Sequence, residues 1–291
     1  MTLSGVHVPL ITPFDADGRV ALDALRRLAD DVLDEGAAGL VALGTTGEPG
    51  SLTEAERRAV VDLVAGVCRE RGVPLTVGAS TAEALAALDP SEVTAALATV
   101  PPFVRPGEAG VVAHFAHLAA LSPVPLIVYN IPYRTGQHLS AGALRDLAAV
   151  PGVAGVKHAV GGIDADTVAL LADAPADFAV LGGDDLVISP LLAMGAHGGI
   201  LASANVVTAG FADLVDAWRT DPARARALAN ALAPLSDALF AAPNPTVVKG
   251  VLHALGRIPT PAVRLPLLPA APETVRAALS ALDRLPVPVA G

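Results

Sequence analysis

The sequence is poor in cysteine, in aromatic residues and in charged residues. Cys68 is the one cysteine among 291 residues, so the chain cannot form an internal disulfide. Aromatic residues make up 3% and charged residues 16%, whereas hydrophobic residues make up 53%. This composition supplies a large apolar core and argues against intrinsic disorder. Because Cys68 lies inside a helical pattern, we expect it to pack in that core.

Basic segments and long apolar segments are also missing. The formal net charge is −10 and no run of basic residues stands out, which argues against nucleic acid and anionic membrane surfaces as partners. No stretch of about 18 apolar residues is free of charge, proline and glycine, so we expect no transmembrane segment. Residues 1–15 lack the basic and apolar regions of a signal peptide. These absences predict a soluble, cytoplasmic protein.

What the sequence does contain is an alternation of short apolar runs with helical patterns. The runs have the length and residue types of buried strands, and each is followed by apolar residues at helical spacing. Thr53 and Glu56 form the capping-box pattern at the start of one helix. The predicted strands cover residues 5–12, 39–43, 74–78, 94–100, 125–130, 153–157, 178–181 and 199–202. The predicted helices that follow them cover residues 22–32, 54–70, 83–88, 107–121, 141–149, 163–174, 186–194 and 207–219.

Repeated strand–helix units of this size indicate parallel strands joined by helical crossovers. Eight such units with uniformly apolar strands favour a closed (β/α)₈ barrel over an open, doubly wound sheet. After Pro222 the pattern is only helical, with helices predicted at 223–239, 246–255 and 272–285. We therefore predict a barrel domain at residues 1–222 and a helical appendage at residues 223–291.

Lys157 ends the predicted strand 153–157. Because burial disfavours the ammonium form, either the amine reaches solvent or a carboxylate, or it stays partly neutral. A partly neutral lysine can attack a carbonyl and form a Schiff base. In a barrel of this type the active site lies at the carboxyl ends of the strands. The other polar residues near those predicted ends are Thr45, Thr46, Glu48, Arg105, Tyr129, Asn130, Arg134, Asp184, Asp185, Ser203 and Asn205.

Four motifs follow these strands. They are GTTGE at 44–48, YNIPYRTG at 129–136, GVK at 155–157 and GDD at 183–185. Together they resemble the dihydrodipicolinate synthase and N-acetylneuraminate lyase superfamily, whose members are pyruvate-dependent aldolases and lyases. The resemblance extends over essentially the whole chain, and it includes GVHVPLITPFD at 5–15, NPTVVKG at 244–250 and RLPLLP at 264–269.

The resemblance implies a class I aldolase mechanism without a metal or a cofactor. Lys157 is expected to form a Schiff base with the ketone of a 2-oxo acid such as pyruvate, and loss of a proton then gives an enamine that attacks an aldehyde. Tyr129 is expected to move protons near the imine. Thr45 and Thr46 are expected to hold the pyruvate carboxylate or to support this proton relay.

The resemblance also implies the substrates. Ile200 is expected to line the pyruvate pocket, and Gly183 of the GDD motif to lie on the substrate side. GTTGE and Arg134 point to the synthase branch, in which this arginine grips the carboxylate of aspartate semialdehyde. The implied function is a lyase of the 4-hydroxy-tetrahydrodipicolinate synthase type that acts as a homo-oligomer, a tetramer or a dimer.

Two residues depart from the family pattern. Phe103 stands where the synthases carry the second tyrosine of their proton relay, and general acid–base steps contribute about 10²–10⁴-fold in rate. Tyr133 offers a replacement hydroxyl. His158 follows the lysine, where the family usually has an acidic residue. Because adjacent strand residues face opposite sides, we expect His158 to face the helices.

Three other functions are also compatible with parts of the sequence. A metal-dependent aldolase is disfavoured, because the seven histidines are scattered and only His114 and His117 share a helical face. A 2-keto-3-deoxy acid aldolase or lyase of the same superfamily would tolerate Phe103 better than a synthase does. A catalytically weakened 2-oxo-acid-binding protein would have little use for an imine-forming amine. Product identity separates the two enzymes, and turnover of any aldehyde separates both from the binding protein.

Overall fold

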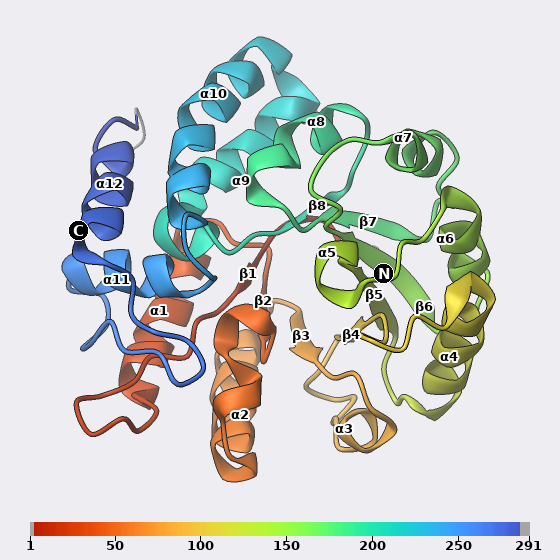
Figure 1. The fold of residues 1–291 in the computed structure, drawn as a ribbon, viewed down its shortest axis with the longest axis horizontal. Helices are drawn as coiled ribbons and strands as arrows, with labels where there is room; N and C mark the ends of the chain where they lie inside the picture. The colour runs from red at the N-terminus through yellow and green to blue at the C-terminus, as the bar shows by residue number, and fades with distance from the viewer. Residues whose placement is uncertain (1–2, 286–291) are drawn as a thin grey trace. The chain divides into compact units, whose positions relative to one another are not determined.

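The computed structural model describes residues 3–285, and its eight parallel strands form a closed barrel (Figure 1). Their order in the sheet is their order in the chain. The strands are β1 (Gly5–Pro9), β2 (Gly39–Ala42), β3 (Leu75–Gly78), β4 (Ala95–Thr99), β5 (Leu126–Asn130), β6 (Val153–His158), β7 (Ala179–Gly182) and β8 (Gly198–Ile200). Each overlaps a predicted strand, and the prediction of a (β/α)₈ barrel is confirmed.

The helices also follow the prediction, with two differences. They are α1 (Leu22–Asp34), α2 (Glu54–Arg71), α3 (Ala82–Ala86), α4 (Gly107–Leu121), α5 (Pro132–Thr135), α6 (Ala141–Ala148), α7 (Ala165–Ala172), α8 (Ile188–Ala193), α9 (Ala204–Thr220), α10 (Pro222–Leu239), α11 (Thr246–Ala254) and α12 (Pro272–Leu282). The short helix α5 was not predicted. Helix α9 begins three residues early, and Val207, the predicted first residue, has non-helical backbone angles because two helical segments meet there.

Side-chain caps explain where several helices begin. Thr53 and Glu56 form the predicted capping box at the start of α2. Ser140 accepts a hydrogen bond from the third residue of α6, and Asp164 does the same for α7. Caps of this kind stabilise a helix by about 1 kcal/mol each. The predicted starts of α2 and α6 are therefore confirmed together with their physical cause.

The described chain divides into two compact units. The first consists of residues 3–5 and 76–200. In it, β4, β5, β6 and β7 pair in parallel, and α4, α6 and α7 pack side by side outside these strands (Figure 1). The core between these layers is almost entirely aliphatic, with Phe115 and Phe178 as its largest members. This unit contains β5 and β6 with the loops that follow them.

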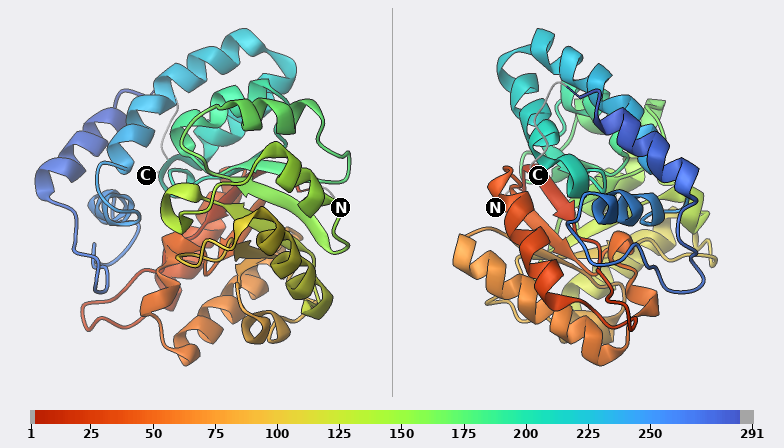
Figure 2. Two further views of the ribbon diagram at one scale, coloured as in Figure 1. Left: turned by 45° about the vertical axis from the view of Figure 1, so that its right-hand side comes forward. Right: turned by 90° about the vertical axis from the view of Figure 1, so that its left-hand side faces the viewer.

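The second unit consists of residues 6–75 and 201–285. Helix α1 packs against α2 and α9, and the long helix α10 runs beside α9 (Figure 2). Helix α12 contacts α10 and α11. The boundary predicted at residue 222 stays a prediction, and residues 286–291 of the predicted appendage lie outside the described residues. Within residues 3–285, no helix is both long enough and apolar enough to cross a membrane.

Candidate active site

Lys157 and Tyr129 lie side by side on neighbouring strands. The register of β5 and β6 pairs Tyr129 with Lys157 directly. The Lys157 Nζ atom lies 4.4 Å from the centroid of the Tyr129 ring. Both side chains are buried, each 7% exposed. The strand is buried as predicted, and it extends one residue beyond Lys157, to His158.

Burial sets the electrostatics of this amine. It lowers the pKa of Lys157 to about 8, because the ammonium form loses its hydration. Asp185 and Asp184 act in the opposite direction, and Arg134 adds to the lowering. Among the residues that the structure describes, no carboxylate forms an ion pair with Lys157. At pH 8 about half of such an amine is neutral, whereas an ordinary lysine is less than about 1% neutral.

The absence of a side chain at Gly183 leaves space for the side chain of Lys157. A Cβ atom at this position would lie 2.8 Å from Lys157 Cε, a distance that real Cβ contacts essentially never show, and 3.0 Å from Cγ, which is tighter than most. The Gly183 N–H donates to the carbonyl of His158 at 2.8 Å, which holds the loop after β7 against β6. Asp184 follows, and its carboxylate accepts a hydrogen bond from Gly161 N–H at 2.7 Å. Only glycine at position 183 therefore fits this path of the lysine.

The segment after β5 presents the next two candidates. Helix α5 carries Tyr133 and Arg134, both exposed, and the Arg134 Cζ atom lies 5.7 Å from the Tyr133 ring centroid. Arg134 influences the pKa of Lys157 through its charge, so the guanidinium lies within electrostatic range of the amine. Ile200 ends β8 and is buried. The roles of these three residues in substrate binding remain predictions.

Phe103 has no packing role within the described chain. Its side chain is 90% exposed and its φ is 66°, a left-handed value that is uncommon for a bulky residue. Its N–H donates to the carbonyl of Thr135 at 3.3 Å, so the backbone of this loop rests on α5. The ring expected in place of a tyrosine therefore points into solvent.

His158 faces the helices, as predicted. It is buried, and its Nε2 lies 2.9 Å from Thr167 Oγ1 on α7. Burial lowers the pKa of His158 to about 4, so the imidazole is neutral at ordinary pH. Cys68 is buried in α2 as expected, and burial raises the pKa of its thiol to about 12.

Thr45 and Thr46 lie in the second unit, in a single 3₁₀ turn at Thr45–Gly47. Thr45 is exposed, whereas Thr46 is buried and its Oγ1 accepts a hydrogen bond from Asn244 Nδ2 at 2.9 Å. Thr12 Oγ1 donates to the carbonyl of Gly47 at 2.7 Å. The GTTGE motif is thus held by residues of two other motif segments.

Sequence reasoning missed an ion-pair frame in the second unit. Lys249 Nζ donates to Glu48 Oε1 at 2.6 Å and to the carbonyl of Ala262 at 2.8 Å. The second oxygen of Glu48 accepts from the Arg264 N–H at 2.9 Å. The glutamate of GTTGE therefore joins NPTVVKG and RLPLLP, two motifs about 200 residues away in the chain. A lysine inside the apolar helix sequence TVVKGVL was the available signal.

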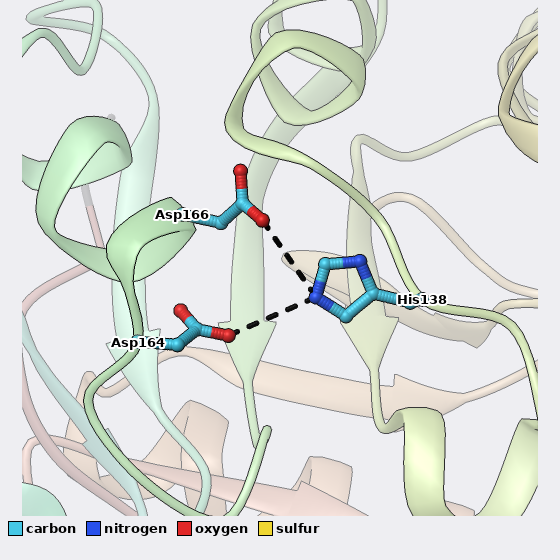
Figure 3. A group of neighbouring side chains, drawn as sticks. All are labelled: His138, Asp164 and Asp166. Atoms are coloured by element: carbon cyan, nitrogen blue, oxygen red, sulfur yellow. Dashed lines mark ion pairs between the residues drawn. The ribbon is translucent and has the colours of Figure 1, made fainter.

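A second missed cluster consists of His138, Asp164 and Asp166 (Figure 3). His138 Nε2 lies 3.7 Å from an Asp164 oxygen and 3.8 Å from an Asp166 oxygen. The other oxygen of Asp166 accepts from Ala141 N–H at 2.9 Å. These side chains are partly exposed, and exposed groups of this kind commonly occur without an ion. They link the start of α6 to the start of α7.

Comparison with known proteins identifies the family. A family model described as the dihydrodipicolinate synthetase family matches residues 2–284. The chain belongs to this family. A 4-hydroxy-tetrahydrodipicolinate synthase from Moorella thermoacetica is 40% identical over 271 residues, which are 91% of this chain and 92% of the relative. The enzyme of that name from Neisseria meningitidis serogroup B is 38% identical over 274 residues, 92% of this chain and 93% of the relative.

Solved structures agree with this assignment. The pyruvate complex of the chloride-inhibited dihydrodipicolinate synthase from Acinetobacter baumannii has a TM-score of 0.92 and 32% identity, and the match covers 97% of this chain and 99% of that one. A structure described as the first monomeric dihydrodipicolinate synthase variant has a TM-score of 0.92 and 28% identity, over 97% and 96% of the chains. The predictions of family and enzyme class are confirmed: the chain is a lyase of the dihydrodipicolinate synthase type.

Proposed function

We propose that the protein condenses pyruvate with aspartate semialdehyde through a Schiff base on Lys157. The observation that carries this proposal is the state of the amine, which is buried, has no carboxylate partner among the described residues and lies 4.4 Å from the Tyr129 ring. Its pKa of about 8 leaves a reactive neutral fraction near neutral pH. The relatives named 4-hydroxy-tetrahydrodipicolinate synthase and the similar structure from Acinetobacter baumannii with bound pyruvate support the choice of substrates.

The chemistry follows from this amine. The nitrogen of Lys157 adds to the keto carbon of pyruvate, and loss of water from the adduct gives the protonated imine. A proton leaves the methyl carbon, and the electron pair of that C–H bond forms the enamine. The enamine carbon attacks the aldehyde carbon, so that a C–C bond forms and the aldehyde oxygen takes up a proton. The amino group of the aldehyde substrate then adds to the imine carbon, closes the ring and releases the amine of Lys157.

The remaining residues keep the roles that the family resemblance implies. The Tyr129 hydroxyl carries protons to and from the imine, and its ring beside the amine supports this role. The guanidinium of Arg134, exposed on α5, binds the carboxylate of the aldehyde substrate. Thr45 and Thr46 hold the pyruvate carboxylate or support the proton relay of Tyr129. Gly183 and Ile200 shape the pyruvate pocket, which accords with the tight contact between Gly183 and the lysine side chain.

The proposed enzyme works in the cytoplasm as a homo-oligomer, a tetramer or a dimer. Exposed apolar side chains in the first unit support self-association, since Phe103, Val104 and Tyr133 are 90%, 74% and 64% exposed. The monomeric variant among the similar structures indicates that oligomeric state varies among such proteins. Size measurement in solution by light scattering tests this part of the proposal.

A second candidate function is the aldol reaction of pyruvate with a different aldehyde, to give a 2-keto-3-deoxy acid. The observation that favours it is Phe103, which offers no hydroxyl for the ring-closing proton transfers. The two candidates share the Schiff base and the enamine, and they differ in the aldehyde and in ring closure. Product analysis with each aldehyde distinguishes them.

Borohydride trapping tests the shared step. The protein is incubated with pyruvate and borohydride, and intact mass and peptide mapping locate the reduced adduct, with Lys157→Ala as the control. An adduct on Lys157 that the substitution removes supports the proposal. Absence of an adduct, or an adduct that persists in Lys157→Ala, contradicts it and favours a protein that only binds 2-oxo acids. Aspartate semialdehyde is the first aldehyde to test after a positive result.

A further inference from the structure

Two residues lie directly behind the pair Tyr129 and Lys157. The register of β5 and β6 pairs Asn130 with His158, immediately after it pairs Tyr129 with Lys157. Successive residues of a strand point to opposite faces, so Asn130 and His158 face the helices while the other two face inward. Asn130 is fully buried and His158 is 2% exposed. Polar groups at this depth persist when they are hydrogen-bonded.

Asn130 and His158 belong to a hydrogen-bond chain whose direction follows from its last member. Thr167 Oγ1 lies 2.7 Å from Asp164 Oδ1 and donates to it, because a carboxylate only accepts. Thr167 Oγ1 therefore accepts from His158 Nε2 at 2.9 Å. With its proton on Nε2, His158 has a bare Nδ1 that accepts from Asn130 Nδ2 at 3.4 Å, the longest contact of the chain.

Burial, and not the surrounding charges, keeps the imidazole of His158 neutral. The charged and titratable groups that act on His158 are Asp164, His138 and Asp166, the side chains drawn in Figure 3. The two aspartates favour the charged imidazole, but burial outweighs them and the ring stays neutral. The Asp164 carboxylate also accepts from Thr167 N–H at 2.7 Å, so the chain ends on the N-cap of α7. Strand β6 is thereby joined to a helix start through side chains alone.

The backbone carbonyls of Asn130 and His158 also hold the segments that surround the Lys157 side chain. The carbonyl of Asn130 accepts from Ala159 N–H at 2.9 Å, and the carbonyl of His158 accepts from Gly183 N–H at 2.8 Å. Gly183 is the residue whose missing Cβ leaves room for Lys157 Cε. A shift of His158 would therefore move both the strand position that precedes it and the glycine against which the lysine rests.

We propose that His158 and Thr167 are positioning residues that hold Lys157 over Tyr129, with a smaller contribution from Asn130. The single hydroxyl proton of Thr167 already goes to Asp164, so residue 158 must be a donor to this hydroxyl. An imidazole that carries its proton on Nε2 meets this requirement. This inference rests on the proposed function, because it assigns a task to the residues behind the Schiff-base lysine.

Substitution of Thr167 tests the proposal with little change in volume. In Thr167→Val the hydroxyl is lost, whereas Thr167→Ser retains it. Thr208→Val is the matched control, since Thr208 is a fully buried threonine whose hydroxyl bonds to Ala204 in the second unit. For each variant we would measure melting temperature and the rate of pyruvate trapping on Lys157 across pH at a range of pyruvate concentrations.

In Thr167→Val we expect the trapping rate at saturating pyruvate to fall about tenfold, with the half-saturating concentration changed less than about twofold, because misplacement affects reaction more than binding. The midpoint of the pH dependence should rise, since an amine displaced toward water regains an ordinary pKa near 10.4. Thr167→Ser should resemble the wild type in rate and midpoint. Thr208→Val should lower only the melting temperature.

Equal rates and midpoints in Thr167→Val and Thr208→Val would overturn the inference, and so would a Thr167→Ser variant as impaired as the valine variant. Failure of the wild type to form any pyruvate adduct is a different result, because it contradicts the proposed function. In that case competitive acetylation of Lys157 across pH still reports the pKa of the amine in each variant. A midpoint that rises in Thr167→Val alone would then still support the positioning role.

Discussion

Lys157 and Lys249 are two buried lysines that differ in what their amines contact. Burial lowers the pKa of both. Lys249 Nζ donates to Glu48 at 2.6 Å and to a backbone carbonyl at 2.8 Å, and both side chains of this ion pair are at most 2% exposed. Lys157 forms no ion pair with any described residue. Depth alone therefore does not distinguish a reactive lysine from a structural one.

Aromatic rings do not distinguish the two amines by proximity either. Lys249 Nζ lies 4.0 Å from the centroid of the Phe14 ring, and Lys157 Nζ lies 4.4 Å from that of Tyr129. The difference is that Tyr129 carries a hydroxyl and Phe14 does not. The Lys249 ammonium is held by a carboxylate, a carbonyl and a ring without a hydroxyl, and these contacts favour the unreactive protonated form. The neutral Lys157 amine keeps its lone pair available for attack, and the Tyr129 hydroxyl can carry protons beside it.

Removal of the Lys157 amine should affect turnover more than any other substitution. We expect Lys157→Ala, and also Lys157→Arg, to lower turnover of pyruvate by at least about 10³-fold, because no imine can form without the primary amine. The fold should remain, since the removed amine has no ion-pair partner among residues 3–285. Trapping, turnover and circular dichroism check this. Residual turnover within about tenfold of the wild type would show that Lys157 is not the reactive lysine.

Lys249 should give the opposite pattern, with a loss of stability. Lys249→Met leaves the buried Glu48 carboxylate without its partner, and we expect this to cost about 3–5 kcal/mol in the free energy of unfolding. The double variant Lys249→Met, Glu48→Gln should recover part of that loss, because the orphaned charge is gone. Urea unfolding measures both. A Lys249→Met protein that is as stable as the wild type would contradict the structural role.

The ion pair of Arg264 with Glu56, which lies beside the Lys249–Glu48 pair, should weaken in acid. Hydrogen bonds from Arg264 lower the pKa of Glu56 to about 2, from an ordinary value of 4.5. The resulting stability is therefore present above about pH 4.5 and is lost as the pH falls toward 2. Because this ion pair is about a quarter exposed, we expect its contribution to be about 1–2 kcal/mol. Glu56→Gln should remove this part of the pH dependence in unfolding experiments between pH 2 and 6.

The sequence predicted the elements and strand ends well, because these depend on local patterns. Helix α4 ends at the predicted residue, β6 extends one residue beyond its predicted end, and His158 faces the helices as strand alternation requires. Helix α5 was missed because it has only four residues between Pro132 and a glycine with φ of 73°. No period of 3.6 is visible over so short a segment.

Local sequence patterns could not predict contacts between segments that are far apart in the chain. Glu48 and Lys249 are 201 residues apart, and each motif by itself is compatible with a binding role. The cluster of His138 with Asp164 and Asp166 needs two loops to meet, and one of these loops follows the unpredicted helix α5. Phe103 was expected to keep the place of a tyrosine ring, but its backbone conformation turns the ring outward. Tertiary geometry, not propensity, decides these positions.

The charges near Lys157 should have only small effects on the reactivity of its amine. Arg134 lowers the pKa of Lys157, whereas Asp184 raises it. Arg134→Leu should therefore move the midpoint of pyruvate trapping to higher pH, and Asp184→Asn should move it to lower pH. Because Arg134 is exposed and screened by solvent, we expect its effect to be less than about half a pH unit.

Trapping with pyruvate alone measures this electrostatic effect by itself. The proposed role of Arg134 is to bind the carboxylate of the aldehyde substrate, and no aldehyde is present in this experiment. Burial is the main cause of the lowered pKa, so both variants should keep a midpoint well below 10.4, the ordinary lysine value. Shifts of opposite sign around a midpoint near 8 would show that burial makes Lys157 reactive and that neighbouring charges only adjust it. A midpoint near 10 in Arg134→Leu would instead make the arginine, not burial, the main cause of the lowered pKa of Lys157.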